Sequence, residues 1–211
     1  AKVPHPQSFC YPDTATFFRQ HPTGGSPVSP PAVCKLDWGG EGDGVFPIMY
    51  DRDMTAVLKR LQEFETTGQK GFILQQWIPA GARALRVVVT GHQLHSYWRV
   101  MPPDSPLVAS LSKGGAIDRT SDHHLIAAAE AATRAFCRHT GINLAGFDFL
   151  FSTDPAVADP ATPLFLEINY FFARRGLGGS AVYYQRLRHA IDHWLANDNA
   201  TLPPAGSESI A

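Results

Sequence analysis

The segments AGFDFLF (residues 145–151) and PLFLEIN (163–169) are the most informative part of this sequence. Each is an apolar run typical of a buried strand, and each contains side chains that carry oxygen: Asp148 in the first, Glu167 and Asn169 in the second. Because side chains alternate along a strand, Glu167 and Asn169 project from the same face. Two carboxylates and an amide are costly to bury among apolar residues unless a partner satisfies them.

Two kinds of partner would satisfy these oxygens. Mg²⁺ takes oxygen ligands and is commonly shared with substrate phosphates, so a magnesium site at Asp148, Glu167 and Asn169 is predicted, and Mn²⁺ would also fit. The alternative is a pair of strand-end carboxylates neutralised by Arg or Lys side chains. The all-oxygen composition of the set favours the metal.

Upstream of these strands, residues 84–90 and 93–100 are predicted to form a hairpin that turns at Gly91-His92. A hairpin loop with an even number of residues places one apolar set on one face: Leu85, Val87, Val89, Leu94 and Trp98. The other face then carries Arg86, His95, Tyr97 and Arg99. Two arginines on one face indicate an anion between them, such as a phosphoryl group or a carboxylate.

Other basic residues extend this set, and it then comprises Arg86, Arg99, Lys113, Arg174 and Arg175. For Arg174 and Arg175 alone, a solvated surface position is an equal alternative. Lys35 ends a predicted strand and precedes the loop GGEGDG (residues 39–44), whose glycines Gly39, Gly42 and Gly44 let backbone N–H groups approach phosphates. A flexible hairpin turn is the alternative for this loop, which is not a Walker A sequence.

The remaining pattern predicts an α+β protein. Residues 1–31 are expected to be irregular with at most one short helix, and residues 71–78 to form a strand. Helices are predicted from Asp53, which would cap the first one, from near Ser121 to Gly141, and after Gly179. The tail beyond Asn197 is small, polar and expected to be disordered.

Composition narrows the classes of function. Lys and Arg number 18 against 19 Asp and Glu, and a net charge of −1 argues against a general binder of nucleic acid or anionic membranes. No apolar run approaches the roughly 20 residues that cross a bilayer. The three cysteines are widely spaced and fit buried thiols of a cytoplasmic protein better than a disulfide framework or a zinc site.

Taken in order, these segments resemble the ATP-grasp superfamily, and most closely the RimK-type glutamate ligases and the glutathione synthetase group. The resemblance runs from about Val3 to Leu195. Its motifs, each loose alone, are VPHPQS (3–8), VCKLDWGGEGDGV (33–45), LQQWI (74–78), LRVVVTGHQLHSYWR (85–99), SLSKGG (110–115) and the AGFDFLF and PLFLEIN pair. Their order and spacing are hard to obtain by chance.

The resemblance implies an ATP-grasp fold with ATP held between two subdomains, residues 1–77 and 78–197, followed by a tail at 198–211. It places Lys35 at the phosphates under a loop closed by Gly39, Gly42 and Gly44. It places the backbone of Gln76, Trp77 and Ile78 against the adenine. It further implies that Asp148, Glu167 and Asn169 hold two Mg²⁺ ions, and that Arg86, Arg99, Lys113 and Arg174 act on the reacting groups.

The implied reaction is ligation of a carboxylate to an amine, each from a small molecule or peptide, through an acyl phosphate. Ala84 and Ser110 replace an Asp and an Asn of the family pattern, and residues 170–179 replace a short family segment, so another substrate is expected. The sequence begins inside the family's linker, which suggests an additional N-terminal domain. A nucleotide sensor without ligase activity and an ATP-grasp kinase are the alternatives, and homo-oligomerisation is left open.

Overall fold

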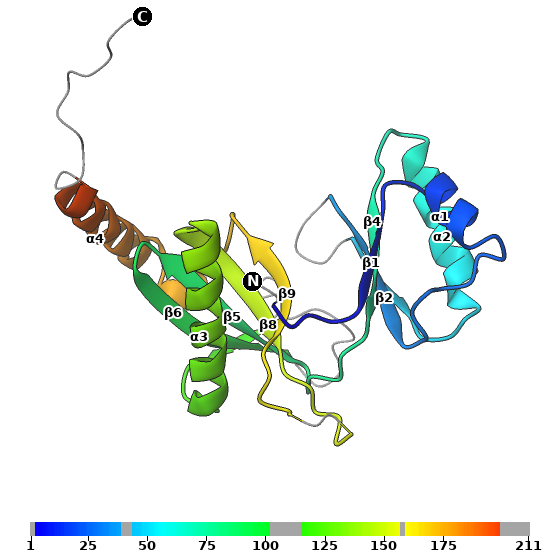
Figure 1. Ribbon diagram of the computed structural model, residues 1–211. Helices are drawn as coiled ribbons and strands as arrows, with labels where there is room; N and C mark the ends of the chain where they lie inside the picture. The colour runs from blue at the N-terminus through cyan, green and yellow to red at the C-terminus, as the bar shows by residue number, and fades with distance from the viewer. Residues whose placement is uncertain (1–2, 39–43, 102–114, 157–158, 199–211) are drawn as a thin grey trace, which may run out of the picture.

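The computed structural model describes residues 3–38, 44–101, 115–156 and 159–198, which form two antiparallel sheets and their covering helices (Figure 1). The first sheet has the strand order β1-β4-β2-β3 and the second β7-β6-β5-β8-β9. Within the described part of the chain this is an α+β fold, as predicted. Gly39, Gly42, Ser110, Lys113 and the tail from residue 199 lie outside the described residues.

The N-terminal sheet is built from β1 (Ser8–Tyr11), β2 (Ala32–Leu36), β3 (Val45–Ile48) and β4 (Phe72–Gln76). Helices α1 (Thr14–Gln20) and α2 (Asp53–Glu65) cover one face of it (Figure 1). The apolar stripe of α2 packs with Phe17 of α1 against alternate residues of the strands, including Cys34 and Leu74. The opposite face of β2 is therefore directed toward the second sheet.

The second sheet contains β5 (Arg83–Thr90), β6 (Gln93–Val100), β7 (Ala116–Asp118), β8 (Leu144–Leu150) and β9 (Leu164–Asn169). Helix α3 (His123–Thr140) covers one face, and its predicted stripe lies in the core: Leu125, Ala129, Ala132 and Phe136. The helix ends at Gly141, whose φ of 75° is left-handed, as the Gly at this position predicts.

The predicted hairpin is confirmed by the register of β5 and β6. Leu85 lies opposite Trp98, and both belong to the core beneath α3. Arg86 lies opposite Tyr97, so the two arginines and Tyr97 share the other face of the sheet.

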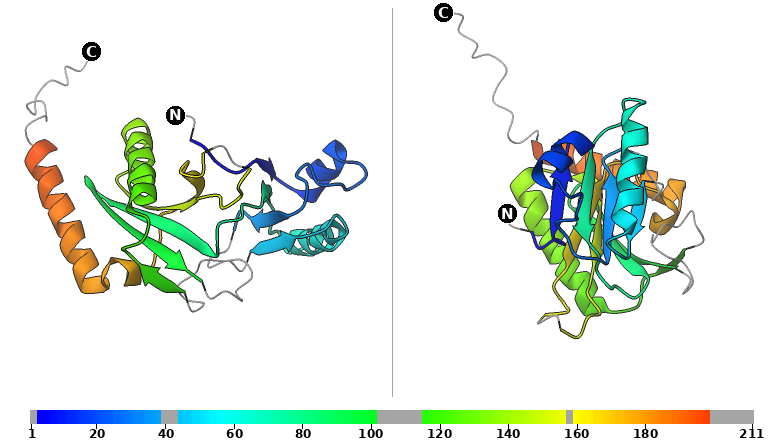
Figure 2. Two further views of the ribbon diagram at one scale, coloured as in Figure 1. Left: turned by 90° about the horizontal axis from the view of Figure 1, so that it is seen from below. Right: turned by 90° about the vertical axis from the view of Figure 1, so that its right-hand side faces the viewer.

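That other face is partly covered by the 3-10 turn η2 (Arg175–Leu177) and helix α4 (Ser180–Asp198). Leu177 packs with Val88 and Tyr97. Gly176 lies so close to the Tyr97 ring that an added Cβ would come within 2.0 Å of it, which only a glycine avoids. In Figure 2, α4 lies at the end of the molecule farthest from the N-terminal sheet.

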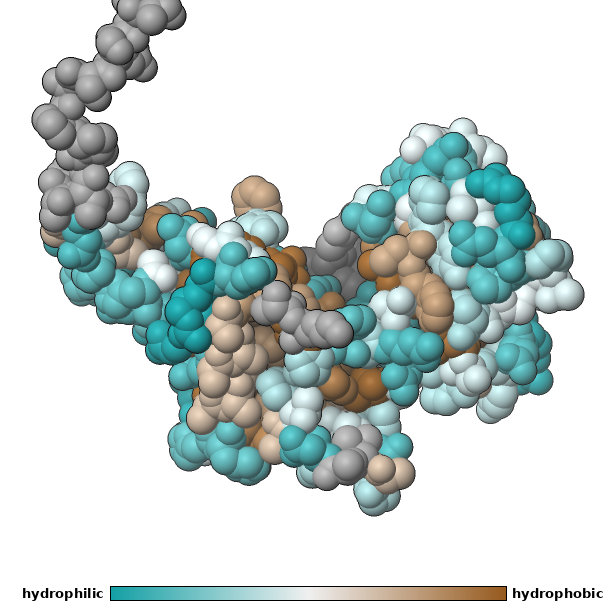
Figure 3. Space-filling view, viewed as in Figure 1, coloured by the Kyte–Doolittle hydropathy of each residue, from teal (hydrophilic) through white to brown (hydrophobic). Residues whose placement is uncertain are grey.

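The two sheets are joined by residues 77–82 and by contacts at their edges. The carbonyl of Pro79 accepts both the N–H and the hydroxyl of Thr153, at 2.7 and 3.0 Å. At the other edge, the N–H of Phe165 donates to the carbonyl of Pro4 at 2.8 Å. In Figure 3 the molecular surface is hollowed between the two halves of the molecule.

Two local predictions were wrong. The Pro-rich start contains strand β1 as well as α1. Asp53 does not cap α2: it is the first helical residue, and its carboxylate accepts the backbone N–H groups of Met49 and Tyr50.

Among the described residues, no helix combines the length and apolar character needed to span a bilayer.

The hairpin turn makes the attachment of α4 testable. Gly91 has a φ of 61°, and an added Cβ would lie 2.8 Å from the Cβ of Ala190 on α4. We expect Gly91→Ala to lower the free energy of unfolding by more than the ~1–2 kcal/mol that left-handed backbone costs, because α4 must also shift. Urea unfolding measures this loss.

Gly141→Ala is the matched control, because Gly141 has a φ of 75° and nothing lies within 4 Å of the added Cβ. The Gly141→Ala variant therefore bears only the cost of left-handed backbone. A loss in Gly91→Ala no larger than in Gly141→Ala would contradict the packing of α4 on this turn.

Candidate functional site

Lys35 faces the second sheet from the end of β2. Its neighbours in β2, such as Cys34, point to the helices, so alternation directs Lys35 across the hollow. Its ammonium interacts electrostatically with Glu167 and Asp148. Burial lowers the pKa of Lys35, and the two carboxylates oppose this by favouring the charged form.

Across the hollow, β8 and β9 bring together the oxygen-bearing side chains that the sequence placed in one set. Asp148 is the register partner of Glu167. The Nδ2 of Asn169 donates to Oδ2 of Asp148 at 3.2 Å and to Oε1 of Glu167 at 3.0 Å. A β-bulge follows between Asp148 and Phe149, at the point where the strands leave the site.

The Asp148 carboxylate is fully buried and is surrounded by N–H donors. Arg86 donates from Nε to Oδ1 and from Nη2 to Oδ2, the latter at 2.7 Å. Arg99 adds a contact from Nη2 to Oδ2 at 2.8 Å, and Asn169 supplies the fourth donor. A carboxylate has about two lone-pair sites on each oxygen. Three of these donors lie on Oδ2 and one on Oδ1, so Oδ2 is fully engaged.

For Asp148, therefore, this structure has the arginine partners that were the alternative to a metal. Although burial alone would raise it, the pKa of Asp148 is held below its usual value by Arg86 and then Arg99. Asp148 conversely raises the pKa of Arg86 against the opposing effect of burial.

Glu167 differs from Asp148 in its surroundings. It is exposed to solvent at the floor of the hollow, yet enough protein surrounds it that burial raises its pKa, and the negative charge of Asp148 raises it further. The hydrogen bond from Asn169 and the charge of Lys35 act in the opposite direction. A cation beside Glu167 and Asn169 would relieve this repulsion, so these two residues fit a divalent ion.

The donor set is limited, since the described residues contain no group of three or more His, Cys, Asp and Glu side chains placed to hold a metal. The Oδ2 atom of Asp148 becomes a ligand only if Arg86 or Arg99 releases it, whereas Oδ1 has a single donor. The Nε of Arg99 is buried and has no hydrogen-bond partner within the described chain, so this guanidinium has a donor to spare.

Two residues of this site were not assigned a role from the sequence. Gly146 lies under Arg86: an added Cβ would be 2.8 Å from Nη1, so the glycine makes room for the guanidinium. A glycine inside a strand is the sequence feature that indicates such close approach. Tyr97 is buried against Gly176 beside both arginines. Burial raises its pKa, while Arg86 and Arg99 lower it.

The segment Gln76-Trp77-Ile78 leaves the N-terminal sheet at the base of the hollow. The N–H of Gln76 donates to the carbonyl of Gln7 at 2.8 Å, and the N–H of Trp77 to that of Pro31 at 3.2 Å. In this conformation these two N–H groups are therefore engaged within the protein.

The other residues predicted to be functional are less well connected to the site. Arg174 is exposed; its guanidinium lies 5.1 Å from the Tyr183 ring and 4.8 Å from the Tyr184 ring, on α4. Gly44 accepts the N–H of Leu36 at 2.9 Å and so closes the base of the glycine-rich loop. Lys113, Gly39 and Gly42 fall outside the described ranges, and their placement stays a prediction.

Comparisons with known proteins show which solved structures have a similar architecture. No protein-family model matches the chain, and no curated protein matches it. Similar solved structures include the D-alanine–D-alanine ligase of Bacillus anthracis, with a TM-score of 0.61 and 13% identity over 90% of this chain and 62% of that one. D-cycloserine synthetase DcsG has a TM-score of 0.58 and 19% identity over 92% of this chain and 66% of that one.

A RimK domain ATP-grasp protein from Sphaerobacter thermophilus gives a TM-score of 0.55 and 18% identity over 83% of this chain and 57% of that one. This chain thus spans less than two thirds of the length of each of these three proteins. At such low identity the likeness concerns the fold and leaves the chemistry to be argued from the residues.

The buried ion cluster makes a stability prediction. Asp148→Asn leaves Arg86 and Arg99 with no anionic partner at this position, so we expect it to lower the free energy of unfolding by about 3–5 kcal/mol. Urea unfolding measures the loss. Asp192→Asn is the control, because the Arg188–Asp192 pair is exposed and separated by 3.9 Å. A loss as small as that of the control would contradict the cluster.

For Glu167 we predict the opposite effect, a gain of stability on substitution. Its pKa is higher in the folded protein than in the unfolded chain, so the ionised carboxylate reduces stability once the pH exceeds its ordinary pKa. We expect Glu167→Gln to raise the Tm of the ligand-free protein at pH 7, with the gain disappearing below the ordinary pKa of Glu. The control is Glu63→Gln on the exposed side of α2. An unchanged or lower Tm at pH 7 would contradict the repulsion.

Proposed function

We propose that this chain, which has the ATP-grasp fold, is the nucleotide-binding part of an ATP-dependent carboxylate–amine ligase. One observation carries the proposal: Lys35 of the first sheet faces Glu167, Asp148 and two arginines of the second across a hollow. Cations from two sheets converge there with carboxylates and an amide, and this is a suitable environment for a metal-bound triphosphate.

In the proposed complex, ATP lies in the hollow with its adenine at residues 76–78. Because the N–H groups of Gln76 and Trp77 are bonded to Gln7 and Pro31, the N–H of Ile78 is the donor that we assign to the adenine. The Lys35 ammonium contacts the phosphates, and the loop that Gly44 closes covers them. Phosphate binding would offset the cost of keeping Lys35 charged.

The arginines exchange partners in this proposal. Arg86 and Arg99 turn from Asp148 to the phosphates, beginning with the unpaired Nε of Arg99. Glu167 and Asn169 would hold Mg²⁺, and Asp148 would be a third ligand once the arginines release it. The ion would supply charge neutralisation on the phosphates. Each carboxylate and guanidinium thereby keeps a charged partner, so the exchange avoids an unpaired buried charge.

The reaction that these groups support needs no covalent bond to the protein. A substrate carboxylate oxygen attacks the γ-phosphorus, the bond to the β–γ bridging oxygen breaks, and ADP leaves. The amine nitrogen then attacks the acyl carbon, phosphate leaves and the nitrogen loses a proton. Lys35 and the arginines stabilise charge on the transferring group and align the reactants. The acid and the amine are small molecules or peptides.

A nucleotide sensor is the second candidate, and the pairing of Asp148 with two arginines favours it. If the arginines keep Asp148, the site binds nucleotide with Glu167 as its remaining carboxylate and performs no ligation. This alternative predicts tight Mg-ATP binding by calorimetry without ADP release that depends on substrate.

Hydroxylamine trapping tests the ligase. With the full-length protein, Mg-ATP and a panel of carboxylic acids, we expect a hydroxamate from at least one acid together with ADP. Glu167→Gln should reduce its formation by about a hundredfold, since it removes a group that acts at the transferring phosphoryl. Glu63→Gln should match the wild type.

Absence of a hydroxamate with every acid would refute acyl-phosphate formation. A phosphorylated product stable to hydroxylamine would indicate a kinase that phosphorylates an alcohol.

A further inference from the structure

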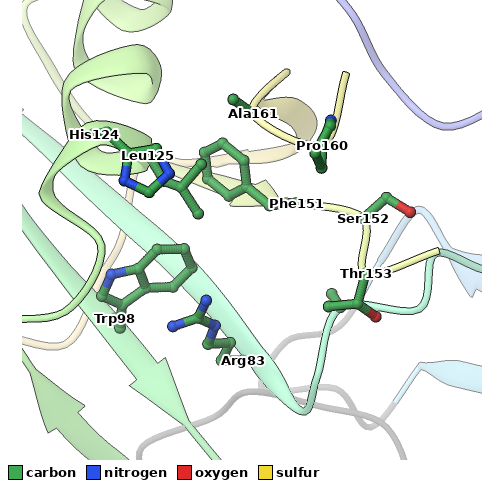
Figure 4. A pocket seen from close by; sticks show the side chains of 10 residues that line it. Arg83, Trp98, His124, Leu125, Phe151, Ser152, Thr153, Pro160 and Ala161 are labelled. Carbon is green, nitrogen blue, oxygen red and sulfur yellow. The ribbon is translucent and has the colours of Figure 1, made fainter. Parts of the chain in front are cut away.

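A second hollow lies on the opposite face of the C-terminal sheet from the arginine cluster. Its volume is about 170 Å³, and it opens between the start of α3 and the ends of β5, β6 and β8 (Figure 4). Trp98 lines it, whereas its neighbour Arg99 points to the nucleotide cleft, because adjacent side chains in a strand face opposite ways. The sheet therefore separates the two sites.

The inner wall of this hollow is apolar and ordered. Trp98, Leu125 and Phe151 are buried, and the rings of Trp98 and Phe151 are 5.7 Å apart. The indole Nε1 of Trp98 donates to the carbonyl of Ser121 at 3.0 Å, which fixes the plane of the ring. An engineered cavity of about 150 Å³ with apolar walls accommodates benzene, so this space admits one six-membered ring.

The mouth of the hollow is polar and contains an arginine. Arg83 lies with its guanidinium 4.3 Å from the centre of the Trp98 ring, and His124 and Ser152 also line the hollow (Figure 4). Arg83 donates through Nη1 to Asp122 at 2.5 Å. A guanidinium has five N–H donors, so this bond leaves others for a ligand.

Backbone strain is concentrated around Arg83. Within the described residues, two non-glycine residues have positive φ: Ala82, at 55°, and Asp122, at 51°. Ala82 precedes Arg83 in the chain, and Asp122 is its ion-pair partner. Such conformations cost about 1–3 kcal/mol each and occur preferentially at ligand sites. Here they place the Arg83–Asp122 pair over Trp98.

We propose that this hollow binds a small planar carboxylic acid. The ring of the acid lies against Trp98 and Phe151, and its carboxylate meets Arg83 at the mouth. An apolar wall with a few converging polar groups is the usual composition of a small-molecule site. Ala80 and Thr153 form part of the same wall, and Thr153 is bonded to Pro79, so an occupant contacts the segment that joins the two sheets.

Benzoate is the probe for this site. It is titrated into the full chain without nucleotide and followed by ligand-observed NMR, so the result is independent of the proposed ligase activity. We expect saturable binding in the millimolar range. Benzamide has the same shape without the charge and should bind about fivefold more weakly, since a charged hydrogen bond is the stronger one.

Two variants locate the binding. Ala161→Phe places a ring in the hollow from its outer wall and should abolish benzoate binding. Arg83→Gln removes the charge and should reduce the affinity for benzoate to that for benzamide. Thermal melting verifies that both variants fold. No saturable binding to the wild type, unchanged binding to folded Ala161→Phe, or equal affinity for benzoate and benzamide would overturn the proposal.

Discussion

The carboxylate of Asp148 lies fully buried in the five-stranded sheet, where Arg86 and Arg99 donate hydrogen bonds to it from two neighbouring strands. Removing one partner of such a buried pair exposes the other to a severe desolvation cost, so the three side chains hold one another in place. Asn169 links the same carboxylate to Glu167. The same contacts therefore hold both the register of β5, β6, β8 and β9 and the geometry of the candidate site.

The charges of this cluster do not balance. Lys35, Arg86 and Arg99 bring three cations to the hollow, while Asp148 and Glu167 bring two carboxylates, one of them with a raised pKa. Ala84, the register partner of Arg99, adds no further carboxylate where the ATP-grasp pattern has an aspartate. An anion with several oxygens therefore complements the site better than a metal ion alone, and a metal–phosphate complex satisfies both kinds of group.

The sequence predicted what alternation and spacing control. It placed Arg86 and Arg99 on one face of a hairpin and grouped Asp148 with Glu167 and Asn169. It did not predict that the two groups pair with each other, because that depends on β5 lying beside β8 and on Gly146 leaving room for a guanidinium. Strand β1 was missed because its flanking prolines dominate the local pattern, although its residues pair with β4.

The hairpin turn at Gly91 keeps the arginines on the cleft face of the second sheet. In β6, Trp98 and Arg99 are adjacent, and in β8 Phe147 and Asp148 are adjacent, so each of these two cleft residues has an apolar neighbour that faces α3. A slip of one residue in the β5–β6 register would place the arginine beneath α3 and the indole in the cleft. Gly91 fixes this register with its left-handed turn, and it also lies against Ala190 of α4. The position of the cations therefore depends on a glycine that contacts none of them.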